Sequence, residues 1–142
     1  MIVLDANLLL YAYDPASPHH AKALVWAEKA FSGNEAVGIP WQTIAAFVRV
    51  ATNARIFGSR FSVERVLGLV DRWLDHPNVR LLTPGDGHWP LLRKTILEGQ
   101  AFGPLSTDAL LAALTIEYGG VLHTTDRDFA RFPGLRWINP LA

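Results

Sequence analysis

Short runs of apolar residues alternate along the chain with longer segments in which apolar side chains recur every three or four positions. The short runs are rich in Val, Ile and Leu and predict strands, whereas the longer spacing is typical of helices with one buried face. The expected strands are 2–4, 36–39, 79–82, 121–123 and 135–138; the expected helices are 6–13, 19–32, 41–52, 63–75, 88–98 and 107–118, with a short helical turn at 126–132.

Polar residues mark where several of these helices begin. Ser17 stands before Pro18, which suits the first turn of a helix, and Ser62 stands directly before another helical segment. A cap at Ser106 or Thr107 is expected to open the last long helix. That helix is apolar nearly all round, which predicts that it is buried.

The alternation of strands and helices favours one α/β domain over residues 1–142. We expect a parallel sheet of four to five strands with helices on both faces, because a parallel sheet needs a helical crossover between successive strands. Ligands of such sheets bind beyond the carboxyl ends of the strands. Candidate chemistry is therefore expected where the strands end.

Composition narrows the possible functions. The chain contains no Cys, which excludes disulfides, cysteine-ligated zinc and thiol catalysis, and favours a cytoplasmic protein. No apolar run approaches the roughly 20 residues that a membrane-spanning helix needs, so no membrane span is expected. With 13 basic and 13 acidic residues, the chain has no overall electrostatic attraction to nucleic acid.

The basic residues are unevenly distributed. From Arg49 to Arg72 there are five Arg, against only Glu64 and Asp71 as acids. A planar guanidinium matches the geometry of phosphate better than an ammonium group does. Arg49, followed by Arg55, is therefore the candidate for a phosphate contact, and a solvated helix face is the alternative interpretation of the same pattern.

Four Asp lie near the expected ends of these elements. Asp5 follows the first strand, and Asp126 and Asp128 follow the strand 121–123. Asp108 lies in the first turn of the buried helix. If these two strands are neighbours, the carboxylates meet at one edge, where a hard divalent cation would relieve their repulsion. Each Asp also has a simpler role open to it: Asp5 and Asp126 as helix caps, Asp108 as a charge near a helix N-terminus and Asp128 as an ordinary surface residue.

Three blocks of sequence resemble the motifs of the PIN domain family. Residues 3–9 (VLDANLL) resemble its opening, residues 105–114 (LSTDALLAAL) its central motif and residues 123–129 (HTTDRDF) its terminal motif. The segments 47–53 (FVRVATN) and 132–141 (FPGLRWINPL) resemble the VapC toxin branch. The match extends over the whole chain in the right order, which makes it specific.

The resemblance implies an endoribonuclease toxin of a type II toxin–antitoxin pair that depends on Mg²⁺, with Mn²⁺ able to substitute. Its implied partners are an RNA substrate such as tRNA or ribosomal RNA, a VapB-type antitoxin whose tail enters the active-site groove, and a second copy in a homodimer. The implied catalytic residues and metal ligands are Asp5, Asp108 and Asp126, with Asp128, Asn7 and Thr124 as auxiliary residues.

One departure keeps other interpretations open. Most PIN domains carry a second acid on the helix after the second strand, but here residues 41–52 contain none, and the nearest polar candidates are Gln42 and Thr43. A catalytically weak PIN-fold binding module, acting through its antitoxin or RNA partner, is therefore the alternative function. An aspartyl-phosphate or receiver-like domain is disfavoured, because Asp5 lacks a neighbouring acid and no Lys stands at an expected strand end.

Overall fold

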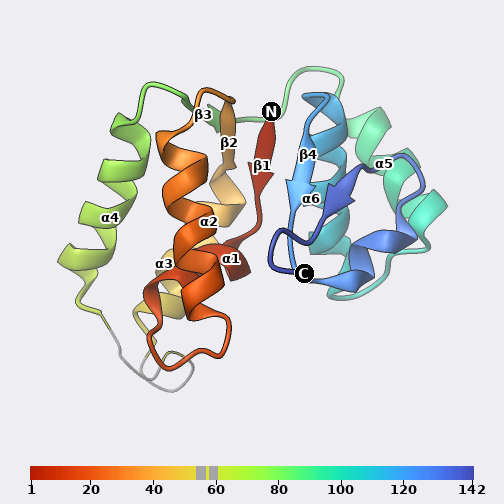
Figure 1. The fold of residues 1–142 in the computed structure, drawn as a ribbon. Coiled ribbons are helices and arrows are strands. Elements are labelled where there is room, and N and C mark those ends of the chain that lie inside the picture. Colours follow the sequence, from red (N-terminus) through yellow and green to blue (C-terminus); the bar gives the residue numbers. More distant parts are fainter. Residues whose placement is uncertain (54–56, 58–60) are drawn as a thin grey trace.

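The chain forms a five-stranded sheet in the order β3-β2-β1-β4-β5, in which all neighbouring strands are parallel (Figure 1). The structure is a computed structural model that describes residues 1–53, 57 and 61–142. Its elements are β1 (Ile2–Leu4), α1 (Ala6–Tyr13), α2 (His20–Ser32), β2 (Val37–Pro40), α3 (Trp41–Ala51), α4 (Val63–Asp75), β3 (Val79–Leu82), α5 (His88–Gly99), α6 (Leu105–Glu117), β4 (Val121–His123), the 3-10 helix η1 (Arg127–Arg131) and β5 (Trp137–Ile138).

Helices cover both faces of the sheet, as the alternation in the sequence predicts. Successive side chains of a strand point to opposite faces, so Leu4 of β1 packs into a core shared with α1, α2, α3 and α4. Val3 points the other way and packs with α5, α6 and η1, as does Leu122 of β4. Figure 1 shows these two helical layers on either side of the strands. The single α/β domain with a parallel sheet is confirmed.

Two expected helix caps are wrong, for local reasons. The Ser17 hydroxyl accepts the backbone N–H of His19 at 3.1 Å, which closes a turn before the helix, and α2 begins at His20 without a side-chain cap. In α6 the Ser106 hydroxyl donates to the Gly103 carbonyl at 2.6 Å. That helix therefore begins earlier, at Leu105, after a turn that Gly103 makes with φ +56°. Ser62 does cap α4, by accepting the Arg65 N–H.

The last strand is shorter than expected. Leu135 is buried, but β5 pairs with β4 only at Trp137 and Ile138. Apolar character at Leu135 thus reflects packing in the core beside α5 and α6 rather than a place in the sheet.

Among the helices that the structure describes, none combines the length and apolar content needed to cross a membrane.

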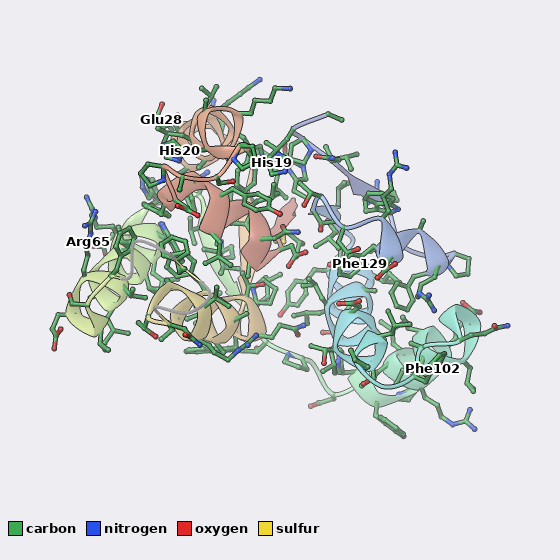
Figure 2. The ribbon with its side chains drawn as sticks, turned by 90° about the horizontal axis from the view of Figure 1, so that it is seen from below. His19, His20, Glu28, Arg65, Phe102 and Phe129 are labelled. Atoms are coloured by element: carbon green, nitrogen blue, oxygen red, sulfur yellow. The ribbon has the colours of Figure 1, made fainter. Side chains whose placement is uncertain are left out.

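The pairing of β1 with β4 determines where the acidic residues meet. These strands are neighbours in parallel register, with Leu4 opposite His123, and the Asp5 N–H donates to the His123 carbonyl at 3.2 Å. Asp5 and Thr124 therefore follow adjacent strands at the same edge of the sheet. Figure 2 shows the molecule from below, the side toward which β1 runs in Figure 1.

Candidate active site

Three carboxylates converge beyond the carboxyl end of β4. One oxygen each of Asp108, Asp126 and Asp128 lies within 4.8 Å of the other two. Asp108 and Asp126 are partly buried, whereas Asp128 is exposed. Carboxylate oxygens are the ligands that hard divalent cations prefer, and a cation would offset the repulsion among these charges. The donor set therefore fits a Mg²⁺-like ion.

Among the residues that the structure describes, Asp5 does not belong to this close group. Its carboxylate nevertheless interacts electrostatically with Asp126. Asp5 occupies the position before α1 in an extended conformation, and its side chain makes no capping hydrogen bond. Burial raises the pKa of Asp5 and Asp126 adds to the shift, while the Thr124 hydroxyl and the nearby backbone N–H groups oppose it. The Thr124 hydroxyl and the N–H groups of Ala6 and Asn7 therefore favour the ionised carboxylate that a metal ligand requires.

The carboxyl group of Asp108 has a pKa well above its ordinary value. Burial, followed by the charges of Asp126, Asp5 and Asp128, raises its pKa to about 6, and Arg131 acts in the opposite direction. A pKa near 6 means that the ionised carboxylate is disfavoured by its surroundings, and a bound cation would relieve this and lower the pKa again. This electrostatic coupling ties all four Asp into one site.

The Thr124 hydroxyl links the two halves of the site. This buried group donates to Asp5 Oδ2 at 2.7 Å and accepts the Asp126 backbone N–H at 3.0 Å. Asn7 Nδ2 donates to the Thr125 hydroxyl at 3.0 Å and lies 3.4 Å from Thr124 Oγ1. Asn7 Oδ1 is buried and has no hydrogen-bond partner within the described part of the chain. A buried oxygen without a hydrogen-bond partner costs free energy. A bound cation or water molecule would supply the missing partner of Asn7 Oδ1, as expected at a metal site.

Asp126 combines two roles that the sequence left as alternatives. Its Oδ1 accepts the Asp128 N–H at 2.8 Å, which caps η1, and the same carboxylate belongs to the close acidic group. The cap holds the start of η1 in place, and with it the backbone that carries Asp128. The third carboxylate of the group is therefore supplied by a residue that we expected to be auxiliary.

Helix α3 contributes polar contacts but no acid. Thr43 donates to the Leu4 carbonyl at 2.7 Å, and Gln42 Nε2 reaches the Thr107 carbonyl at 3.5 Å. These bonds join α3 to the end of β1 and to the first turn of α6. Arg49 is exposed further along α3, and Arg55 lies outside the described residues.

Comparison with known proteins places this arrangement in a family. The family model of the PIN domain matches residues 2–135. The chain is 37% identical over 141 residues to ribonuclease VapC33 of Mycobacterium tuberculosis, covering 99% of each chain. The chain belongs to the PIN domain family. This PIN domain is also 37% identical to ribonuclease VapC37 of the same organism over 142 residues, covering 100% of this chain and 99% of the relative.

Solved structures share the fold of this PIN domain. VapBC2 from Rickettsia felis, bound to a DNA fragment from its promoter, matches with a TM-score of 0.68 at 19% identity and covers 98% of both chains. VapC20 of M. tuberculosis, a toxin that cleaves the sarcin–ricin loop, matches with a TM-score of 0.63 at 16% identity, covering 96% of this chain and 99% of that one. The resemblance to VapC ribonucleases, and with it the class of phosphodiester hydrolase, is confirmed.

Arg131 is a residue of the site that the sequence did not reveal. From the end of η1, its Nη1 donates to the carbonyls of Gly99 and Gln100 at 3.1 and 3.4 Å, where α5 ends. Its charge also acts on Asp108. No motif connects Arg131 with a turn about 30 positions earlier in the sequence. Only the packing of η1 against α5 brings them together.

Proposed function

We propose that this PIN domain is the toxin of a VapBC-type pair, an endoribonuclease that depends on Mg²⁺ and accepts Mn²⁺ in its place. Its proposed substrates are structured cellular RNAs such as tRNA or ribosomal RNA. The observation that carries the proposal is the group of three carboxylates at the carboxyl edge of the sheet, in a chain whose relatives are named ribonuclease VapC.

The proposed metal ligands include Asp5, Asp108 and Asp126, as the sequence motifs imply, and the closeness of Asp128 supports adding it to the set. When bound, a divalent cation supplies charge neutralisation at a phosphodiester and lowers the pKa of a water that attacks it. The chain itself orients the carboxylates. Thr124 holds Asp5, and the cap of η1 holds Asp126 and Asp128 at a fixed spacing.

Substrate contacts are proposed outside the acidic group. Arg49 is exposed on α3, so its guanidinium is accessible to an RNA phosphate. The first turn of α3 is bonded to Thr107, next to Asp108, which places this helix beside the acidic group. Arg55 is kept as a second phosphate contact on the sequence pattern alone. Asn7 and Thr124 are proposed to support the ligands rather than to touch the RNA.

The proposed partners are a VapB-type antitoxin and a second copy of the chain, with residues 1–142 acting as one PIN domain in the cytoplasm. Several structural neighbours are VapBC complexes, which supports the antitoxin. Charged residues make up 18% of the chain, below the roughly 25% of average soluble domains, which supports a surface covered by partners.

Neutralising one ligand tests the proposal. We expect Asp108→Asn to reduce Mg²⁺-dependent cleavage of a tRNA pool by more than about 100-fold, because loss of a ligand exceeds the 10–100-fold effect of residues around a metal site. Asp86→Asn is the matched control, since Asp86 is an exposed acid in the loop after β3. Cleavage that survives EDTA, or that Asp108→Asn leaves at the wild-type rate, would contradict the proposal.

The alternative of a binding-only PIN module keeps one observation in its favour, the absence of an acid on α3. Such a module would bind RNA or antitoxin without releasing cleaved products. Electrophoresis of the same reactions separates the two functions, because a binding module shifts intact RNA and generates no new 3′ ends at any Mg²⁺ or Mn²⁺ concentration.

A further inference from the structure

Phe102 is exposed to an extent that is unusual for an aromatic side chain. Its exposed fraction of 75% is the highest among the exposed large hydrophobic residues that the structure describes. Figure 2 labels it in the same half of the molecule as Phe129 of η1. Isolated exposed apolar side chains are common, so the exposure gains meaning only from where the ring lies and how it is held.

The turn that carries Phe102 is held by several hydrogen bonds. Before Phe102, Gln100 adopts a left-handed conformation with φ 49°, and the Ala101 N–H donates to the Ile96 carbonyl at 3.0 Å. After it, the Leu105 N–H donates to the Phe102 carbonyl at 3.2 Å. Ala101 is buried and Gly103 has no side chain, so neither neighbour competes for the space around the ring. The ring is thus presented by an ordered turn.

This turn is connected to the acidic group by two routes. It leads directly into the first turn of α6, which carries Asp108. Arg131 provides the second connection, because its Nη1 is bonded to the Gly99 carbonyl while its charge acts on Asp108. Asp108 is three positions into α6, which corresponds to about 4.5 Å of helix rise from Leu105. Phe102 is six positions before Asp108 and three before the start of α6, so its turn lies at the same end of that helix as this candidate metal ligand.

Electrostatics alone gives this edge little affinity for RNA. The chain has a net charge of zero, and the carboxylates at the edge repel phosphates until a cation is present. An exposed aromatic ring offers a contact that does not depend on charge, since every nucleic-acid base can stack on it. Sequence-specific recognition of RNA commonly uses such stacking on unpaired bases.

We propose that Phe102 is a stacking platform for one unpaired base of the RNA, close to the phosphodiester held at the acidic group. This inference rests on the proposed ribonuclease function and adds a residue that positions the substrate. It assigns Arg131 the role of holding the turn that presents the ring. Neither residue belongs to the motifs that identify the family in this sequence.

The test measures the dissociation constant of a fluorescein-labelled RNA hairpin with an unpaired loop by anisotropy, and kcat and KM for its cleavage. We expect Phe102→Ala to raise both the dissociation constant and KM by about 5- to 150-fold, the range for losing one stacked base, with kcat nearly unchanged. Phe102→Trp should bind like the wild type. Trp89→Ala is the matched control, because Trp89 is 63% exposed at the opposite end of α5 and should have no effect.

RNAs that carry an abasic site at successive positions locate the stacked base. At that one position, the abasic site should weaken RNA binding by the wild type by the same factor as Phe102→Ala weakens binding of the intact RNA. The abasic site should not weaken binding by Phe102→Ala any further. Non-additivity of this kind identifies a direct contact. Equal losses for both proteins at every position would overturn the stacking contact.

Mass measurement in solution separates RNA stacking from a protein interface. If Phe102→Ala, or Leu97→Ala on the neighbouring turn of α5, shifts the oligomeric state while RNA affinity per chain is unchanged, the ring belongs to a protein contact and the inference is wrong. The ribonuclease proposal fails separately, if wild-type protein binds the RNA but never cleaves it. In that case the anisotropy arm still decides whether Phe102 stacks on a base.

Discussion

The hydroxyl of Thr124 connects three parts of the site, because it bonds Asp5, the backbone of Asp126 and, at longer distance, Asn7. We expect Thr124→Val to lower the free energy of unfolding by about 1–3 kcal/mol, since it leaves buried polar groups without a partner. Cleavage should fall by about 10–100-fold, as for other residues that orient metal ligands. Urea denaturation and initial cleavage rates measure the two effects.

Two comparison variants show whether the effect of Thr124→Val is specific. Thr124→Ser keeps the hydroxyl and should retain most of the activity. Thr115→Val removes another buried hydroxyl, which bonds the Leu111 carbonyl of its own helix, and should leave cleavage unchanged. Equal losses of activity in Thr115→Val and Thr124→Val would mean that the site responds to general destabilisation rather than to the Thr124 bonds.

The raised pKa of Asp108 predicts how stability depends on pH in the absence of metal. Its pKa rises from 3.8 to about 6 in the folded protein, so between these values the folded state binds this proton more tightly than the unfolded chain does. Raising the pH through this window therefore lowers the free energy of unfolding. Asp108→Asn lacks the titrating group. Its melting temperature should therefore exceed that of the wild type by more at pH 7 than at pH 4. Melting curves in EDTA that keep a constant offset between the two proteins would contradict this assignment.

At the residue scale, the sequence predicted which acids lie near the ends of elements but not which of them come closest together. Asp108 and Asp126 could be predicted to approach each other, because parallel strands and the helix leading into β4 share one edge. The closeness of Asp128 depends on a 3-10 turn whose geometry has no periodic signal. Arg131 depends on the same turn and on the packing of α5, so local sequence could not indicate it.

At the scale of elements, the helices and strands were predicted well where hydrophobic periodicity is strong and poorly where they begin. The starts of α2 and α6 differ from the expected caps, because Ser17 and Ser106 form turn hydrogen bonds instead of capping a helix. Short polar side chains are suited to both roles. The choice between them depends on neighbours such as Gly103, whose positive φ already turns the chain before α6.

A pair of glycines tests how closely η1 must pack against α5. A Cβ built on Gly99 would lie 2.5 Å from two ring atoms of Phe132, which is buried directly after η1. We expect Gly99→Ala to destabilise the protein by about 1–3 kcal/mol, as overpacking of a core does, and to reduce cleavage because Asp128 and Arg131 move with η1. Gly68→Ala is the control: a Cβ there has open space within 4 Å and should stabilise α4 by about 0.5–1 kcal/mol. Wild-type cleavage by Gly99→Ala would show that the position of η1 does not affect the site.

At the scale of the whole molecule, the sheet order was the step that local sequence could not supply. The argument for a site depended on β1 and β4 being neighbours, and nothing in either segment indicates its partner. The order β3-β2-β1-β4-β5 places both strands near the middle of the sheet, with α6 beside their carboxyl ends. The alternation of strands and helices supplied the fold class, and the family resemblance supplied the candidate site residues, but neither gave the strand order.

This central location predicts that metal binding stabilises the entire fold. The acids lie at the end of β1, in the first turn of α6 and at the start of η1, so a cation that joins them binds the folded chain and not the unfolded one. At a Mg²⁺ concentration about 100 times its dissociation constant, stabilisation of about 2.7 kcal/mol should raise the melting temperature by about 5–10 °C. Asp86→Asn should show the full rise, and Asp108→Asn only a small part of it. KCl at matched ionic strength serves as the control for screening. A rise that KCl reproduces would reflect general charge screening, and a rise that Asp108→Asn retains in full would place the cation away from the acidic group.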